Sequence, residues 1–128
     1  MPVIPITPRH LNDAESAVLG KILSVDLPWA GALRAQVETC QVVSQWASDS
    51  VSVDIEPTTA TVPATGVGDG VLHVVGAVRA LPGAEMPFEG EILIWVGNGF
   101  LAGIEYAWYG EEMPTALPSP ERIEIEIE

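Results

Sequence analysis

The fold is decided by residues 91–106, which read EILIWVGNGFLAGIEY. Asn98 and Gly99 at the centre tolerate the positive φ that a two-residue hairpin turn requires, and apolar residues typical of strands stand on both sides. The stretch therefore predicts two antiparallel strands, residues 89–96 and 100–109, joined by a tight turn.

Counting pairs outward from this turn predicts which side chains share a face. Alternation from a pair between Gly97 and Phe100 puts Glu105 on one face with Ile92, Ile94, Val96 and Leu101. The other face then carries Leu93, Trp95, Ile104, Tyr106 and Trp108. An antiparallel sheet needs only one buried face, so large apolar residues on both faces predict a second cover. We expect the second face to bind a partner or a second copy of the chain, because Trp and Tyr are common interface anchors; the alternative is a strongly bent sheet that wraps this face into its own core.

Patterns outside the hairpin predict the remaining elements. Asn12 and Glu15 have the spacing of a capping box, and apolar residues recur at helical spacing up to Leu23, so we expect a helix of about three turns. Residues 29–36 fit both a helix and a strand, and their composition favours a short second helix. Apolar patterns predict further strands at residues 40–46, 51–56, 71–81 and 123–128.

Two segments lack such patterns. Prolines at positions 2, 5 and 8 predict an extended arm over residues 1–8, and the small, polar stretch 57–70, PTTATVPATGVGDG, predicts a long flexible loop. The whole sequence thus predicts a single α+β domain over residues 1–128, with one or two N-terminal helices packed on a curved antiparallel sheet of five to six strands.

The chain combines strong acidity with a high apolar content. Its 128 residues include 18 Asp plus Glu and 5 Lys plus Arg, a formal net charge of -13, yet 48% are hydrophobic. This apolar content favours a compact domain over disorder. Five scattered cations argue against binding to nucleic acid and against binding to an anionic membrane surface.

The sequence also bears on compartment and cofactors. The start, MPVIPITP, lacks the basic segment of a secretory signal, and the longest apolar stretch, residues 92–104, is too short to span a bilayer. We therefore expect a cytoplasmic protein. The single Cys40 excludes an intramolecular disulfide and a cysteine-rich zinc site, and it fits a small core residue better than a nucleophile. We expect neither a metal ion nor a cofactor.

His73 and Glu105 are the candidates for a functional pocket. The predicted pairing places the Glu105 carboxylate among apolar side chains, an arrangement found at functional sites, and His73 lies on a neighbouring strand. A His–Glu pair could carry out acid–base chemistry if the two residues share a face. A solvated glutamate and an exposed histidine are the plainer interpretation, since the sequence has no nucleophile motif and no metal-ligand spacing.

Part of the chain resembles a family of small, uncharacterised bacterial proteins. In the family an apolar strand, a glycine turn, a Leu-x-x-Leu-Glu-aromatic strand and a Leu-Pro-x-Pro exit follow one another; here these are ILIWV, GNG, LAGIEY and PTALPSP, between residues 92 and 120. ALRAQ at 32–36 and SVDIE at 52–56 are also similar, so the resemblance covers most of the chain after the first helix. Some relatives carry a Gly-Cys pair where this chain has ASDS at 47–50. The resemblance implies a single small α+β domain, and no activity comes with it.

Three functions are compatible with these patterns. The first is a non-enzymatic protein-binding protein, in one form an immunity-type inhibitor of a basic toxin, because residues 85–128 hold ten Glu and only Arg122 as a cation. The second is a small-molecule-binding or enzymatic pocket around His73 and Glu105. The third is a structural homo-oligomer joined through the aromatic face of the hairpin.

Overall fold

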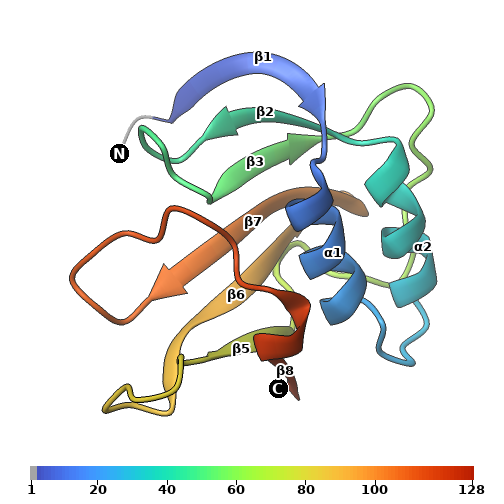
Figure 1. Ribbon diagram of the computed structural model, residues 1–128. Coiled ribbons are helices and arrows are strands. Elements are labelled where there is room, and N and C mark those ends of the chain that lie inside the picture. The colour runs from blue at the N-terminus through green and yellow to red at the C-terminus, as the bar shows by residue number, and fades with distance from the viewer. Residues whose placement is uncertain (1–2) are drawn as a thin grey trace.

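Two helices pack against one twisted antiparallel sheet in the computed structural model, which describes residues 3–128 (Figure 1). This arrangement confirms the predicted α+β class. The elements in chain order are β1 (Ile4–His10), α1 (Asp13–Ile22), α2 (Ala30–Ala35), η1 (Gln36–Glu38), β2 (Gln41–Gln45), β3 (Val53–Glu56), β4 (Gly70–Val71), β5 (Val74–Arg79), β6 (Phe88–Gly97), β7 (Phe100–Trp108), η2 (Pro120–Arg122) and β8 (Ile123–Ile127).

The sheet has eight strands, more than the five to six predicted. Its hydrogen-bonded order is β1-β2-β3-β7-β6-β5-β8, and the short β4 pairs with β6. One additional strand is β1, which covers most of the predicted arm; Pro5 and Pro8 are tolerated because a proline on an edge strand need not remove a ladder bond. The other arises because Leu72 and His73 divide the predicted strand 71–81 into β4 and β5.

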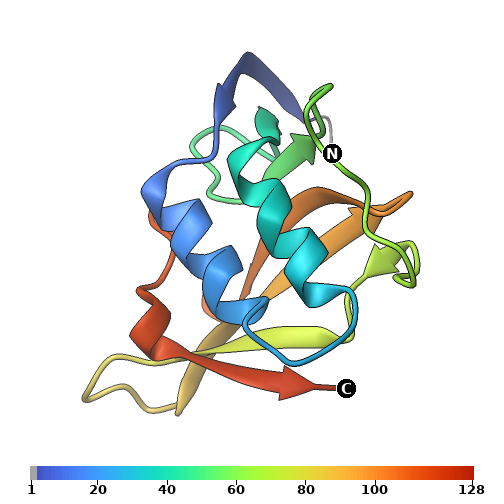
Figure 2. The same cartoon turned by 90° about the vertical axis from the view of Figure 1, so that its right-hand side faces the viewer.

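Both helices lie on the same side of the sheet (Figure 2). The predicted capping box starts α1: Asn12 Oδ1 accepts a bond from the Glu15 N–H at 2.8 Å, and the Glu15 carboxylate accepts one from the Asn12 N–H at 2.9 Å. Apolar side chains of α1 and α2, including Leu19, Ile22 and Leu33, are buried in one core with side chains of the sheet. Within the described part of the chain, neither helix is long and apolar enough to cross a membrane.

The hairpin turn forms as predicted. Asn98 and Gly99 have φ values of 53° and 81°, as a two-residue turn of this type requires. The first two pairs are also the predicted ones, Gly97 with Phe100 and Val96 with Leu101.

The predicted pairing is wrong beyond these two pairs. Trp95 pairs with Gly103 rather than with Ala102, so Ala102 is a β-bulge, one additional residue on β7. Because side chains alternate along a strand, this single insertion exchanges the two sides of the rest of β7. Ile104 and Tyr106 therefore turn into the core.

The predicted loop at 57–70 is irregular but bonded to the rest of the molecule. Gln36, 2% exposed, donates from Nε2 to the carbonyl oxygens of Val62 at 3.0 Å and Gly99 at 2.8 Å. Its Oε1 accepts a bond from the Leu101 N–H at 2.9 Å. One buried side chain thus joins the loop, the hairpin turn and the segment after α2.

Candidate functional site

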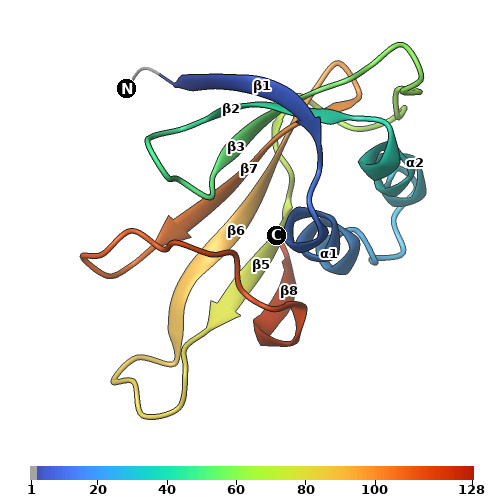
Figure 3. The ribbon, with the colours of Figure 1, turned by 45° about the horizontal axis from the view of Figure 1, so that its top comes forward.

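The side of the sheet away from α1 and α2, which we name the outer face, is the candidate site (Figure 3). No helix within residues 3–128 lies over it. Strand pairing places these neighbouring residues on it: Ser44, Asp54, Val75, Ala77, Glu91, Leu93, Trp95, Gly103, Glu105, Glu124 and Glu126. The face therefore runs continuously from β2 to β8.

Two tryptophan side chains are fixed on the outer face by carboxylates. Trp95 Nε1 donates to Glu105 Oε1 at 3.0 Å, and Trp46 Nε1, just after β2, donates to Asp54 Oδ1 at 3.1 Å. Ser44 Oγ donates to the other Asp54 oxygen at 2.7 Å. Both oxygens of Asp54 are thus occupied, whereas Glu105 Oε2 accepts no hydrogen bond from residues 3–128.

The outer face is acidic. Its carboxylates are Asp54, Glu91, Glu105, Glu124 and Glu126. Arg79, at the end of β5, is bound to Glu124 at 2.5 Å, so its charge is already compensated. Tyr109 lies near the same end: partial burial, and then the carboxylates of Glu91 and Glu126, raise the pKa of its phenol. Acidic and aromatic groups therefore share this face.

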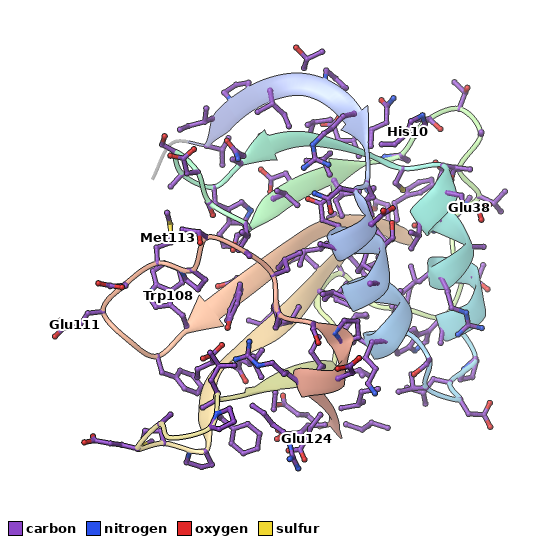
Figure 4. The ribbon with its side chains drawn as sticks, viewed as in Figure 1. His10, Glu38, Trp108, Glu111, Met113 and Glu124 are labelled. Carbon is purple, nitrogen blue, oxygen red and sulfur yellow. The ribbon has the colours of Figure 1, made fainter. Side chains whose placement is uncertain are left out.

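A shallow groove of about 310 Å³ opens beside Glu105. Aromatic and apolar side chains supply much of its lining, among them Trp46, Trp108 and Met113. Trp108 and Met113 lie side by side near the end of β7, while Glu111 points away from the molecule (Figure 4). The groove thus combines an apolar wall with one carboxylate.

The bulge at Ala102 divides the five residues of the predicted interaction face. Leu93 and Trp95 lie on the outer face, whereas Ile104 and Tyr106 are buried in the core. Trp108 alternates with the core side of β7 but lies where the strand ends, and it is 38% exposed. The same bulge moves Glu105 from the predicted apolar surroundings to the outer face.

The structure does not bring His73 and Glu105 together. His73 is exposed between β4 and β5, and its carbonyl oxygen accepts a bond from the Glu128 N–H at 2.7 Å. Glu105 lies on β7, and β6 separates β7 from β5. No hydrogen bond between residues 3 and 128 joins the two side chains, and the groove beside Glu105 is lined without His73.

A second hollow, of about 800 Å³, lies under residues 110–119. Glu89 Oε1 accepts a bond from the Tyr106 hydroxyl at 3.0 Å and pairs with Arg122, which also donates to the carbonyl oxygen of Arg79. Burial, and then the bond to Glu89, raises the pKa of Tyr106. The sequence patterns missed this cluster, because its members are far apart in the chain. The hydrogen bonds and the ion pair of this cluster join β6, β7 and η2, so the cluster has a structural role.

Other reactive groups are separate from the outer face. Cys40 is buried, burial raises the pKa of its thiol, and its Sγ lies 4.0 Å from Thr61 Oγ1. A protonated, buried thiol is a poor nucleophile, so Cys40 acts as a core residue. Between residues 3 and 128, no three His, Cys, Asp or Glu side chains are grouped as metal ligands.

Comparisons with protein-family models, with curated proteins and with solved structures gave no match. The resemblance to small bacterial proteins therefore stays a prediction.

Proposed function

We propose that this protein is a non-enzymatic, cytoplasmic binding protein whose outer face recognises a basic protein partner. The observation that carries the proposal is the composition of that face. Five carboxylates share this face with two indole rings that are each bonded to a carboxylate, the adjacent cation is already paired, and no helix of the described residues covers the face.

Charge and aromatic groups contribute differently to such binding. A surface of one sign speeds the encounter with an oppositely charged partner and rejects partners of like charge. Affinity comes mainly from a few anchors, and Trp and Tyr are the most common of these. The outer face offers both, because Trp95 and Trp46 are each bonded to a carboxylate.

The groove beside Glu105 is the expected anchor point. The unbonded Glu105 Oε2 can accept a bond from a lysine or arginine of the partner, whose methylene groups would lie on Trp108 and Met113. A cation close to an indole ring gains further stabilisation from the ring's electrons.

The other two functions are less well supported. A homodimer through the outer face would set carboxylates against carboxylates, which is unfavourable. An enzymatic pocket at His73 and Glu105 would need the two side chains to converge, and β6 lies between them. An immunity-type inhibitor that covers the cationic active site of a basic toxin, such as a nuclease, is the specific form of binding that this surface suits.

The test is affinity capture with matched variants. Outer-face variant E91Q/E105Q/E126Q removes three negative charges while keeping side-chain volume. Control variant D13N/D26N/E38Q removes three exposed charges elsewhere, at the start of α1, between the helices and in η1. We expect a basic protein captured by the wild type and by the control to bind the outer-face variant at least about tenfold more weakly.

Salt dependence provides the second measurement. Raising the salt from about 50 to about 300 mM should slow association with the wild type and change that of the outer-face variant much less. Capture of the same proteins by all three forms, with equal salt dependence, would refute the proposal.

A further inference from the structure

β8 is an edge strand whose outer side is available for pairing. It is the last strand in the sheet order, and it pairs with β5 through five consecutive residues without a shift of register. Figure 2 shows β8 at the margin of the sheet, with β5 on one side. No other strand of residues 3–128 pairs with its second side.

One hydrogen bond identifies which backbone groups of β8 face away from β5. The Glu128 N–H donates to the His73 carbonyl at 2.7 Å, and backbone groups alternate in direction along an antiparallel strand. Glu124 and Glu126 therefore bond toward β5. The N–H and C=O groups of Ile125 and Ile127 point away from β5, to the free side.

The opposite edge of the sheet is not available in this way. β1 contains Pro5 and Pro8, and its pairing with β2 shifts register between Pro5 and Arg9. Prolines and irregular register are common devices that prevent an edge from pairing with another chain. β8, with its strict Ile–Glu alternation, carries neither.

We infer that β8 binds an extended basic segment of the partner as a further antiparallel strand of the sheet. This inference rests on the proposed function and specifies how the partner is held. Glu124, Glu126 and Glu128 all alternate onto the outer-face side, so a strand with a lysine or arginine at every second position matches them. A second copy of β8 would place glutamates opposite glutamates.

The side chains on the other side of β8 specify the alternate positions of this segment. Ile127 is 64% exposed, because the helices leave this end of the strand uncovered. Apolar residues between the basic ones would pack beside Ile125 and Ile127. The predicted ligand is therefore an extended segment of alternating basic and apolar residues.

The probe for this inference is a synthetic eight-residue peptide that alternates lysine and valine, compared with a peptide of the same composition in which four lysines precede four valines. Binding is measured by isothermal titration, and the ladder by amide hydrogen exchange. We expect the alternating peptide to bind at least about tenfold more tightly, and to slow exchange at the Ile125 and Ile127 amides.

Variant I127P removes one outward N–H donor and no bond to β5, and I127T keeps the donor while changing the side chain. We expect I127P to bind the alternating peptide at least about tenfold more weakly, and I127T to stay within about threefold of the wild type. Circular dichroism confirms that both variants fold.

The outcomes separate strand addition from binding to the outer face. Equal affinity for the two peptides, or unchanged binding by I127P without amide protection, would overturn strand addition. If strand addition is overturned but E91Q/E105Q/E126Q still binds the captured basic protein more weakly than the wild type does, the proposed function holds. If the wild type and E91Q/E105Q/E126Q bind the basic protein equally well, the proposed function is refuted too.

Discussion

Alternate residues of β6 lie in two different environments. Ile92 and Ile94 are fully buried under the helices, whereas Leu93 and Trp95, their immediate neighbours, lie partly exposed on the outer face. The strand is apolar on both sides, but only one side is covered. Within this strand, Ile92 and Ile94 therefore contribute mainly to stability, while Leu93 and Trp95 remain accessible to a partner.

Truncating one residue on each side of β6 should reveal the largest difference in stability between the two sides. We expect I94A to lower the free energy of unfolding by about 3 kcal/mol, because it leaves a cavity in a packed core. L93A, next to it, should cost about 1 kcal/mol, because solvent already reaches its side chain. Urea denaturation followed by tryptophan fluorescence measures both. Equal losses would show that the outer face is covered in solution.

The sequence predicted the local features of these two faces well. The capping box of Asn12 and Glu15 and the turn at Asn98 and Gly99 formed as expected, because a few adjacent residues determine each of them. The periodicity of β6 also identified its two sides correctly.

What failed was the relation between the strands. The bulge at Ala102 is a feature of the pairing of β7 with its neighbouring strands, which are distant in the sequence or joined to it by the turn. A single inserted residue exchanges the two sides of the strand. Gly103 was the available signal, because a glycine within a strand often marks a bulge or a close approach. An added Cβ there would lie 3.0 Å from the Val53 carbonyl oxygen. The candidate pair of His73 and Glu105 depended on which strands are neighbours, and β6 lies between β7, which carries Glu105, and β5, which follows His73.

Polar groups on the two faces provide the second test. Q36L should lower the free energy of unfolding by about 2 kcal/mol, since it leaves the buried Leu101 N–H without its acceptor and removes two donated bonds. W46F removes one donor on the outer face, where Asp54 keeps its bond to Ser44, so we expect a loss of about 0.5 kcal/mol. Thermal unfolding of the two variants measures the difference, and an equal decrease in Tm would contradict it.

Replacing one buried carboxylate and one on the outer face by the corresponding amide compares the two environments without changing side-chain volume. Glu15 is 3% exposed and accepts two bonds from Arg9, at 2.8 and 2.9 Å, so E15Q should cost about 1.5 kcal/mol. D54N on the outer face should cost less than about 0.5 kcal/mol, because an amide can bond both Ser44 and Trp46. Chemical denaturation at neutral pH gives both values. A larger loss for D54N would assign the outer face a structural role.

The smallest expected effect is a difference between Tyr106 and Tyr109 in how stability changes at alkaline pH. Burial and the bond to Glu89 raise the pKa of Tyr106, so the folded protein keeps its phenol protonated more strongly than the unfolded chain does. This contribution to stability is complete below about pH 10 and is lost as the pH rises further. Y106F should cost about 1 kcal/mol at neutral pH, and should make stability fall less steeply above pH 10 than in the wild type.

Tyr109 is the matched residue near the outer face. It is 61% exposed. Partial burial, and then the carboxylates of Glu91 and Glu126, raise its pKa, but solvent screens these effects, so Y109F should leave the alkaline slope nearly as in the wild type. Urea denaturation at several pH values between about 8 and 11 measures the three slopes. If Y109F flattens the slope as much as Y106F does, the outer face must bury Tyr109 in solution, and a surface buried in this way would not be available to a partner.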